Sequence, residues 1–293
     1  MTRRGLFLFA AMCVIWGLPY LLILVAVREL SPAVLVLART TLAAAILLPL
    51  AAWRGELRAL AGHWPPLLAF AAIEIAIPWV LLGAAEQHVT SSLTALVIAG
   101  VPLVATVIAA TTGARERFAP VNLLGLGIGI VGVAAIVGLN LDGSALPLLA
   151  LAVVAVCYAV GPAILQRWLS GLPAMGVIAA SLAVTAVVYA PIAAFSLPSE
   201  TPSAKAIGSV VGLAVVCTAI AFVCFFALIA EVGPVRATVI TYVNPAVAAV
   251  LGVVILDEHL TAAMVTGFAL VLVGSVLATR APVSGLEPAG EHV

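Results

Sequence analysis

Hydrophobic residues form long runs along most of the chain, and polar residues gather in short breaks between them. A helix needs about 20 mainly apolar residues to cross a bilayer, because the hydrocarbon core is about 30 Å thick. Ten runs meet this length, at approximately residues 5–27, 32–53, 66–84, 90–112, 120–139, 145–167, 173–195, 205–230, 234–256 and 261–279. The pattern predicts an all-α polytopic membrane protein with ten transmembrane helices.

The first run follows Thr2-Arg3-Arg4 and therefore has to be compared with a signal peptide. A signal peptide has an apolar stretch of about 7–15 residues that ends in a small-residue cleavage site. This run continues to about residue 27, contains Trp16 and Pro19, and leads into no such site. We therefore expect it to be the first membrane helix.

Composition supports a membrane environment and excludes several other classes of protein. Of the 293 residues, 65% are hydrophobic and 8% are charged, whereas soluble domains carry about 25% charged residues. The net charge is zero, which argues against a nucleic-acid partner, because such a partner requires a basic face. All four cysteines lie within apolar runs, so we expect no disulfide, no metal site and no cofactor.

Basic residues divide unevenly between the two sets of loops, and cytoplasmic loops are the ones that carry an excess of Lys and Arg. With the N-terminus inside, only Arg28 and Lys205 fall on the outer side. The inner side then holds eight arginines, which are Arg3, Arg4, Arg54, Arg58, Arg115, Arg117, Arg167 and Arg280. We predict that both termini are cytoplasmic.

The two halves of the chain resemble each other. Pro102 and Pro245 match at an offset of 143. At an offset of 142 the matched pairs are Glu116 and Glu258, Gly125 and Gly267, Gly132 and Gly274, and Trp16 and Tyr158. Five is an odd number of helices, so the second copy enters the membrane from the opposite side, as in many secondary transporters. We predict repeats at residues 1–140 and 141–281, with a flexible cytoplasmic tail at 282–293.

The matched segments resemble a known family signature. The first copy runs from Val101-Pro102 through Glu116 to Gly125 and Gly132, and the second runs from Asn244-Pro245 through Asp257-Glu258-His259 to Gly267 and Gly274. This pattern is similar to that of the drug/metabolite transporter superfamily, EamA type. Trp16-Gly17 and Ala38-Arg39 resemble it too. The first acidic turn reads Ala114-Arg115-Glu116-Arg117 and lacks the glycine that usually precedes the glutamate.

The resemblance implies a ten-helix carrier of a bacterial inner membrane that exports amino acids or other metabolites through a central cavity. Within the superfamily, the chain looks most like the bacterial amino-acid exporters of the YddG type, which handle aromatic amino acids. We expect a monomer whose partners are a small-molecule substrate and the lipid bilayer.

Ionisable side chains inside a bilayer are expensive, and they mark a function or a specific partner. Two lie well inside predicted spans: Arg39, about 10 Å from the outer end of its helix, and Glu74, about 12 Å from the inner end of its own. We expect Arg39 to reach the outer interface or to hold backbone carbonyls. Glu74 has three candidate roles, as a proton-coupling acid, a ligand for a substrate ammonium group, or the partner of Arg39.

Several aromatic residues lie deep in the spans beside helix breakers, and paired breakers in the two halves point to a midplane binding site. An aromatic wall would stack on an apolar substrate or bind its ammonium group, although each ring has packing as its alternative role. We predict substrate contacts by Trp16, Glu74, Trp79, Tyr158, Tyr242 and Asn244. We predict hinges at Pro19, Pro78, Pro102, Gly161, Pro162 and Pro245.

Other motifs have structural interpretations. Glu116 and Glu258 lie at turns, where we expect them to contact helix N-termini or neighbouring helices. The glycine pairs 125/129 and 267/274 favour close helix packing. The sequence Gly127-x-Gly129-x-x-Gly132 spells a dinucleotide fingerprint, but no strand precedes it, so we interpret it as a packing ridge.

Three classes of function remain to be compared. A carrier working by alternating access fits the repeat best. A passive channel or facilitator is the second, although channels select through charged rings or carbonyl filters, which this sequence does not suggest. An enzyme is the third, and no motif for a nucleophile or a metal site supports it. The cargo can also be another class of metabolite, such as nucleosides or cationic drugs.

Overall fold

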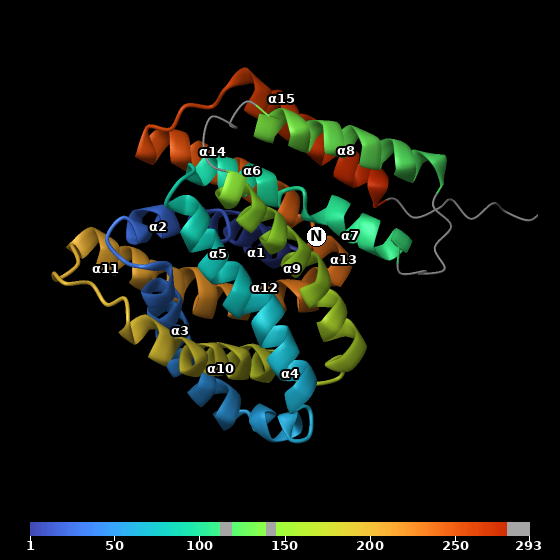
Figure 1. Cartoon of the computed structure of the whole chain (residues 1–293). Helices are drawn as coiled ribbons and strands as arrows, with labels where there is room; N and C mark the ends of the chain where they lie inside the picture. The colour runs from blue at the N-terminus through green and yellow to red at the C-terminus, as the bar shows by residue number, and fades with distance from the viewer. Residues whose placement is uncertain (112–118, 139–144, 280–293) are drawn as a thin grey trace, which may run out of the picture.

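The computed structural model describes residues 1–111, 119–138 and 145–279, and this part of the chain is helical, without β-strands (Figure 1). In the first half the elements are α1 (Arg3–Ile15), α2 (Leu18–Val27), α3 (Pro32–Trp53), η1 (Glu56–Leu60), α4 (Trp64–Phe70), η2 (Ala71–Ala76), α5 (Ile77–Glu86), α6 (Ser91–Ile98), α7 (Val101–Thr111) and α8 (Pro120–Gly138). In the second half they are α9 (Ala145–Trp168), α10 (Ala174–Ala194), α11 (Ala204–Val211), η3 (Gly212–Ile220), α12 (Ala221–Val232), α13 (Pro234–Ala237), α14 (Ile240–Leu256) and α15 (Ala262–Ala278).

These elements form ten apolar crossings within the described residues. Eight continuous helical stretches are long and apolar enough to span a membrane. The two remaining ones, α14 and α15, are apolar helices of 17 residues each. The predicted all-α architecture is therefore confirmed. The third crossing ends at Glu86 rather than near residue 84, so Glu86 belongs to the helix and not to the loop after it.

Two crossings contain π-helical segments, and the two segments occupy equivalent places in the two halves. The first is η2, which holds Glu74 and is followed by Pro78 at the start of α5. The second is η3, which lies about 142 residues further along the chain. A π-helical turn leaves the regular hydrogen-bond ladder and is frequent at functional sites. The paired breakers that the sequence indicated lie instead in the first and sixth crossings, where α1 and α2 are separate helices but α9 continues through Gly161 and Pro162.

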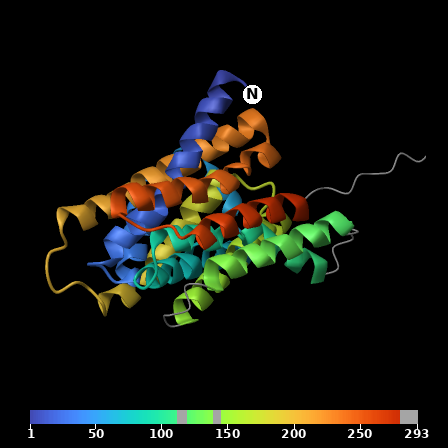
Figure 2. The same ribbon diagram turned by 90° about the horizontal axis from the view of Figure 1, so that it is seen from above.

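Helices from the two halves pack against their own counterparts. Figure 1 and Figure 2 both show α8 and α15 lying side by side. A Cβ atom added to Gly132 would stand 2.6 Å from the Gly267 carbonyl oxygen, and one added to Gly125 would stand 2.5 Å from the Ala278 nitrogen. The predicted close approach of glycine-bearing helices is therefore confirmed. Packing of α3 on α10 and of α6 on α14 joins the halves in the same way.

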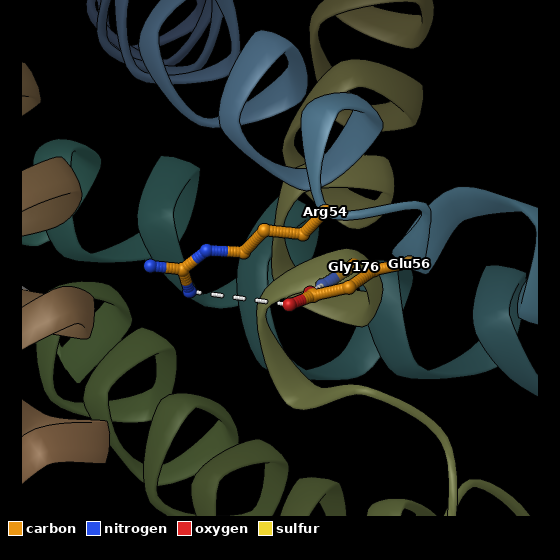
Figure 3. A network of polar contacts seen from close by, with 3 residues as sticks. All are labelled: Arg54, Glu56 and Gly176. Carbon is orange, nitrogen blue, oxygen red and sulfur yellow. Dashed lines mark hydrogen bonds and ion pairs between the residues drawn. The ribbon is translucent and has the colours of Figure 1, made fainter.

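Loop contacts tie the halves together at both ends. At one end Glu56 accepts a hydrogen bond of 2.9 Å from the Gly176 backbone nitrogen, and Arg54 lies 3.9 Å from the same carboxylate (Figure 3). At the other end Glu29 accepts hydrogen bonds of 2.6 Å from the backbone nitrogen and from the hydroxyl of Ser203. The hydrogen bond from the Ser203 hydroxyl lowers the pKa of Glu29 most, and the hydrogen bond from the Ser203 backbone nitrogen lowers it further.

Candidate functional site

Arg39 lies on α3 and is buried, with 7% of its surface exposed. Its guanidinium carbon stands 3.5 Å from the centre of the Trp79 ring, a cation–π contact between α3 and α5. Its Nε donates a hydrogen bond of 3.0 Å to the hydroxyl of Thr218 on η3. The expected reach to the outer interface or to backbone carbonyls is wrong, because side chains from both halves hold the guanidinium inside the bundle.

Glu74 lies on η2 with its carboxyl group against Gly161 of α9. A Cβ atom at Gly161 would collide with Glu74 Oε2 and stand 3.0 Å from its Cδ, so the glycine makes room for the carboxyl group. Oε2 is buried and has no hydrogen-bond partner among the described residues. An unpartnered buried oxygen is costly. Glu74 and Arg39 do not form an ion pair. Among the residues that the structure describes, the one ion pair is Arg54–Glu56.

Tyr158 of α9 completes a cluster with these side chains. It lies close to Glu74, Arg39 and the Trp79 side chain, and it is half-buried. Trp79 itself is 8% exposed. Figure 1 shows α5 and α9 crossing the middle of the molecule together. Four of the predicted residues therefore lie in one region of the bundle, and we call Arg39, Glu74, Trp79 and Tyr158 the central cluster.

The other three predicted contact residues lie elsewhere. Trp16 packs against Phe222 and Phe225 of α12, with ring centres 6.0 and 4.7 Å away. The Tyr242 hydroxyl lies 3.4 Å from the Thr279 hydroxyl near the end of α15. In the amide orientation that satisfies its partners, the Asn244 nitrogen donates to the carbonyls of Ile240 and Cys13, 2.9 and 3.1 Å away. These contacts join helices to one another rather than to the central cluster.

The predicted hinge residues fall into two groups. Pro19, Pro78 and Pro102 stand at the beginnings of α2, α5 and α7. Turns precede α2 and α7, whereas the π-helical segment η2 leads directly into α5. Pro162 and Pro245 lie inside α9 and α14. The Glu74 carboxyl group occupies the space that a side chain at Gly161 would take. Whether these positions bend during a transport cycle stays a prediction.

A separate cavity of about 1120 Å³ opens near the ends of α2, α5, α6, α9 and α14. Its polar lining includes Glu86 and Glu258. Glu258 accepts hydrogen bonds from the Ser91 nitrogen (2.8 Å), the Ser91 hydroxyl (2.9 Å) and the Ser92 nitrogen (2.9 Å), which cap α6. Its predicted role as an interhelical contact is confirmed.

Glu86 is a candidate that the sequence interpretation missed. It is 2% exposed, and neither carboxyl oxygen has a hydrogen-bond partner among the described residues. The nearby backbone is that of Leu24, and Tyr20 of α2 also lies close. The missed signal was the apolar stretch Leu81–Ala85, which continues the helix up to Glu86 without a break.

Some predictions fall on residues outside the described part of the chain. These are the role of Glu116, the placement of Arg115, Arg117 and Arg280, and the tail at 282–293.

Ten apolar crossings with charged side chains enclosed between them define a multi-pass α-helical membrane protein. The sequence profile of the EamA-like transporter family matches residues 3–138 and again residues 145–280. The chain belongs to this family, and it is a membrane transporter. The resemblance to the drug/metabolite transporter superfamily is thereby confirmed, whereas the amino-acid exporter subclass stays a prediction.

A solved structure, titled "Crystal structure of protein", shares the fold with a TM-score of 0.67. It is 22% identical in sequence, and the alignment covers 95% of this chain and 97% of that one. No curated protein matches the chain in a sequence comparison.

Proposed function

We propose that the protein is a secondary carrier that exports amino acids with aromatic or apolar side chains across a bacterial cytoplasmic membrane. The observation that carries this proposal is the Glu74 carboxyl oxygen Oε2, which is buried within the central cluster and has no hydrogen-bond partner among the described residues. A group placed there at such cost has a functional role or a specific partner by default.

The chemistry of the central cluster is complementary to an amino acid. A zwitterionic substrate brings one carboxylate and one ammonium group. Arg39 offers a guanidinium with donors beyond the one used by Thr218, and Glu74 offers an unpaired oxygen. Trp79 and Tyr158 offer aromatic faces for an apolar side chain. One cluster thus supplies a counterpart for each part of the substrate.

The burial of the cluster supports transport by alternating access. Arg39 and Trp79 are almost fully enclosed, so helices must move before a substrate can reach them. The π-helical segments η2 and η3 lie at equivalent places in the two halves. Glu74 of the cluster lies on η2, and Thr218 on η3 accepts the hydrogen bond from Arg39. Rocking of one repeat against the other about such a site is the mechanism that inverted repeats support.

Uptake of a labelled amino-acid panel into proteoliposomes tests the proposal. We expect aromatic and apolar amino acids to accumulate, and trans substrate to accelerate uptake, because a carrier exchanges its cargo whereas a channel does not. Glu74→Gln should reduce uptake by about tenfold, since one charged hydrogen bond is worth about 1.5–3 kcal/mol. Glu200→Gln, in an exposed loop, is the matched control and should transport normally.

Two outcomes would contradict the proposal. If the protein takes up no amino acid but does take up nucleosides or cationic drugs, the proposed substrate class is wrong. Glu74→Gln with wild-type transport across about pH 5.5–8 would remove Glu74 from both substrate binding and proton coupling. If only the pH dependence is lost, the carboxyl group couples protons rather than binding the ammonium group.

A further inference from the structure

We propose that the cavity beside Glu86 is a second binding site, which takes a primary ammonium group carried on an apolar body. Glu86 lies 12 residues after Glu74 along the same crossing, which places it about 18 Å away. The site is therefore distinct from the central cluster, and it does not depend on amino acids being the transported substrate.

The first support is the state of the Glu86 carboxyl group. It is 2% exposed, it belongs to the cavity lining, and both of its oxygens lack hydrogen-bond partners among the described residues. Burying a carboxylate without a compensating group is unfavourable. A compensating cation can approach the Glu86 carboxyl group through the cavity, because Glu86 is part of its lining.

The second support is the charge around the cavity. Its lining holds three acidic residues, Glu86, Asp257 and Glu258, against one arginine, Arg28. Arg28 is exposed, and among the described residues it forms no ion pair with Glu86. His88 and His259 line the cavity and are exposed as well. The hydrogen bonds from α6 hold Glu258 in place as an acceptor, so an entering cation meets two neighbouring carboxyl groups.

The third support is the size and apolar lining of the cavity, which select the class of cation. Its volume of about 1120 Å³ is slightly above the range of roughly 300–1,000 Å³ for small-molecule sites. Leucine and valine side chains contribute much of the wall, namely Leu24, Val27, Leu93, Leu148 and Leu256. An ammonium group with a hydrocarbon body matches this combination.

A metal ion matches it less well. Calcium takes about six to eight oxygen ligands. Within the described residues, no group of three or more His, Cys, Asp or Glu side chains is arranged to hold a metal. An ammonium group needs fewer acceptors, and the two unpartnered oxygens of Glu86 supply them.

Calorimetric binding of phenethylammonium to the purified protein in lipid nanodiscs at neutral pH tests the site. We expect Glu86→Gln to weaken binding by about tenfold or more, and Glu86→Asp, which keeps the charge, to weaken it less. Glu200→Gln, in an exposed loop, should bind like the wild type, and the part of the binding that depends on Glu86 should persist in Glu74→Gln. The neutral analogue 2-phenylethanol should show no dependence on Glu86.

The proposal fails if Glu86→Gln binds phenethylammonium as tightly as the wild type, or if the wild type does not bind it. It also fails if Glu74→Gln, rather than Glu86→Gln, removes binding, because the ammonium group then occupies the central cluster. Equal loss for 2-phenylethanol in Glu86→Gln would show an altered cavity and would contradict recognition of charge. Transport assays on the amino-acid panel are independent of these results.

Discussion

At the scale of single residues, Gly161 and Glu74 share one small space between α9 and η2. Glu74 Oε2 occupies the position that a side chain at residue 161 would fill, and the Glu74 Cβ atom lies 3.3 Å from that position. The carboxyl group is the flexible partner, because the helix backbone of α9 cannot move aside as easily. The glycine therefore determines where the Glu74 charge lies.

Gly161→Ala should displace the Glu74 carboxyl group and reduce transport by about tenfold. The loss of stability should be near the lower end of the 1–3 kcal/mol typical of overpacking, about 1 kcal/mol, because a side-chain tip can rotate away. Transport and thermal unfolding of the purified variant measure the two effects. Gly208→Ala, at a position with open space around it, is the control. Unchanged transport in Gly161→Ala would mean that the carboxyl position is unimportant.

At the scale of elements, the pair α8 and α15 shows how glycines determine helix packing. Gly132 and Gly267 face each other's backbone, so neither helix can accept a methyl group by a side-chain rotation. Gly127 lies on the same helix and has nothing within 4 Å of its added Cβ position. A glycine that packs and a glycine that does not therefore lie within the same helix, α8.

Gly132→Ala should destabilise the protein by about 2 kcal/mol or more, because backbone atoms must separate to admit the methyl group. Gly127→Ala should be neutral or slightly stabilising, since alanine is the better helix former. Unfolding in increasing fractions of a denaturing detergent measures both variants against the wild type. Equal stability of the two variants would contradict the close backbone packing between α8 and α15.

At the scale of the whole molecule, the two repeats interlock rather than lie side by side. Three crossings of the first repeat pack on their own counterparts, in the pairs α3 and α10, α6 and α14, and α8 and α15. The loop contacts Glu56–Gly176 and Glu29–Ser203 connect the repeats at opposite ends. Inward and outward faces are therefore built from both repeats, and the loop charges determine which face is cytoplasmic.

Single cysteines in a variant without the four native ones should report this orientation. Ala59 on η1 and Ser199 in the loop before α11 are both exposed. A membrane-impermeant maleimide should label Ser199→Cys in intact cells and Ala59→Cys only after permeabilisation, because the arginines near Ala59 favour the cytoplasmic side. The reverse labelling pattern would place both termini outside.

Much of the architecture could be predicted because its causes are local. Apolar length, breaks with turn residues and repeated glycines are visible along the chain, and a bilayer requires each crossing to satisfy its own backbone hydrogen bonds. Glu74 and Arg39 stood out for the same reason, as charges within apolar runs. Glu86 did not stand out, because it lies at the end of its helix. Helix ends are poorly defined by sequence, so a residue there can be assigned either to the bilayer or to a loop.

By itself the sequence determined that the chain spans a membrane through ten helices in two related halves, and that Arg39 and Glu74 lie within the spans. Only the tertiary structure decided what those charges meet. Arg39 contacts Thr218, 179 residues away, rather than the outer interface, and Glu74 meets Gly161 rather than Arg39. The physical reason is that membrane insertion depends on hydropathy along one helix, whereas the partner of a buried polar group depends on how helices from both halves pack.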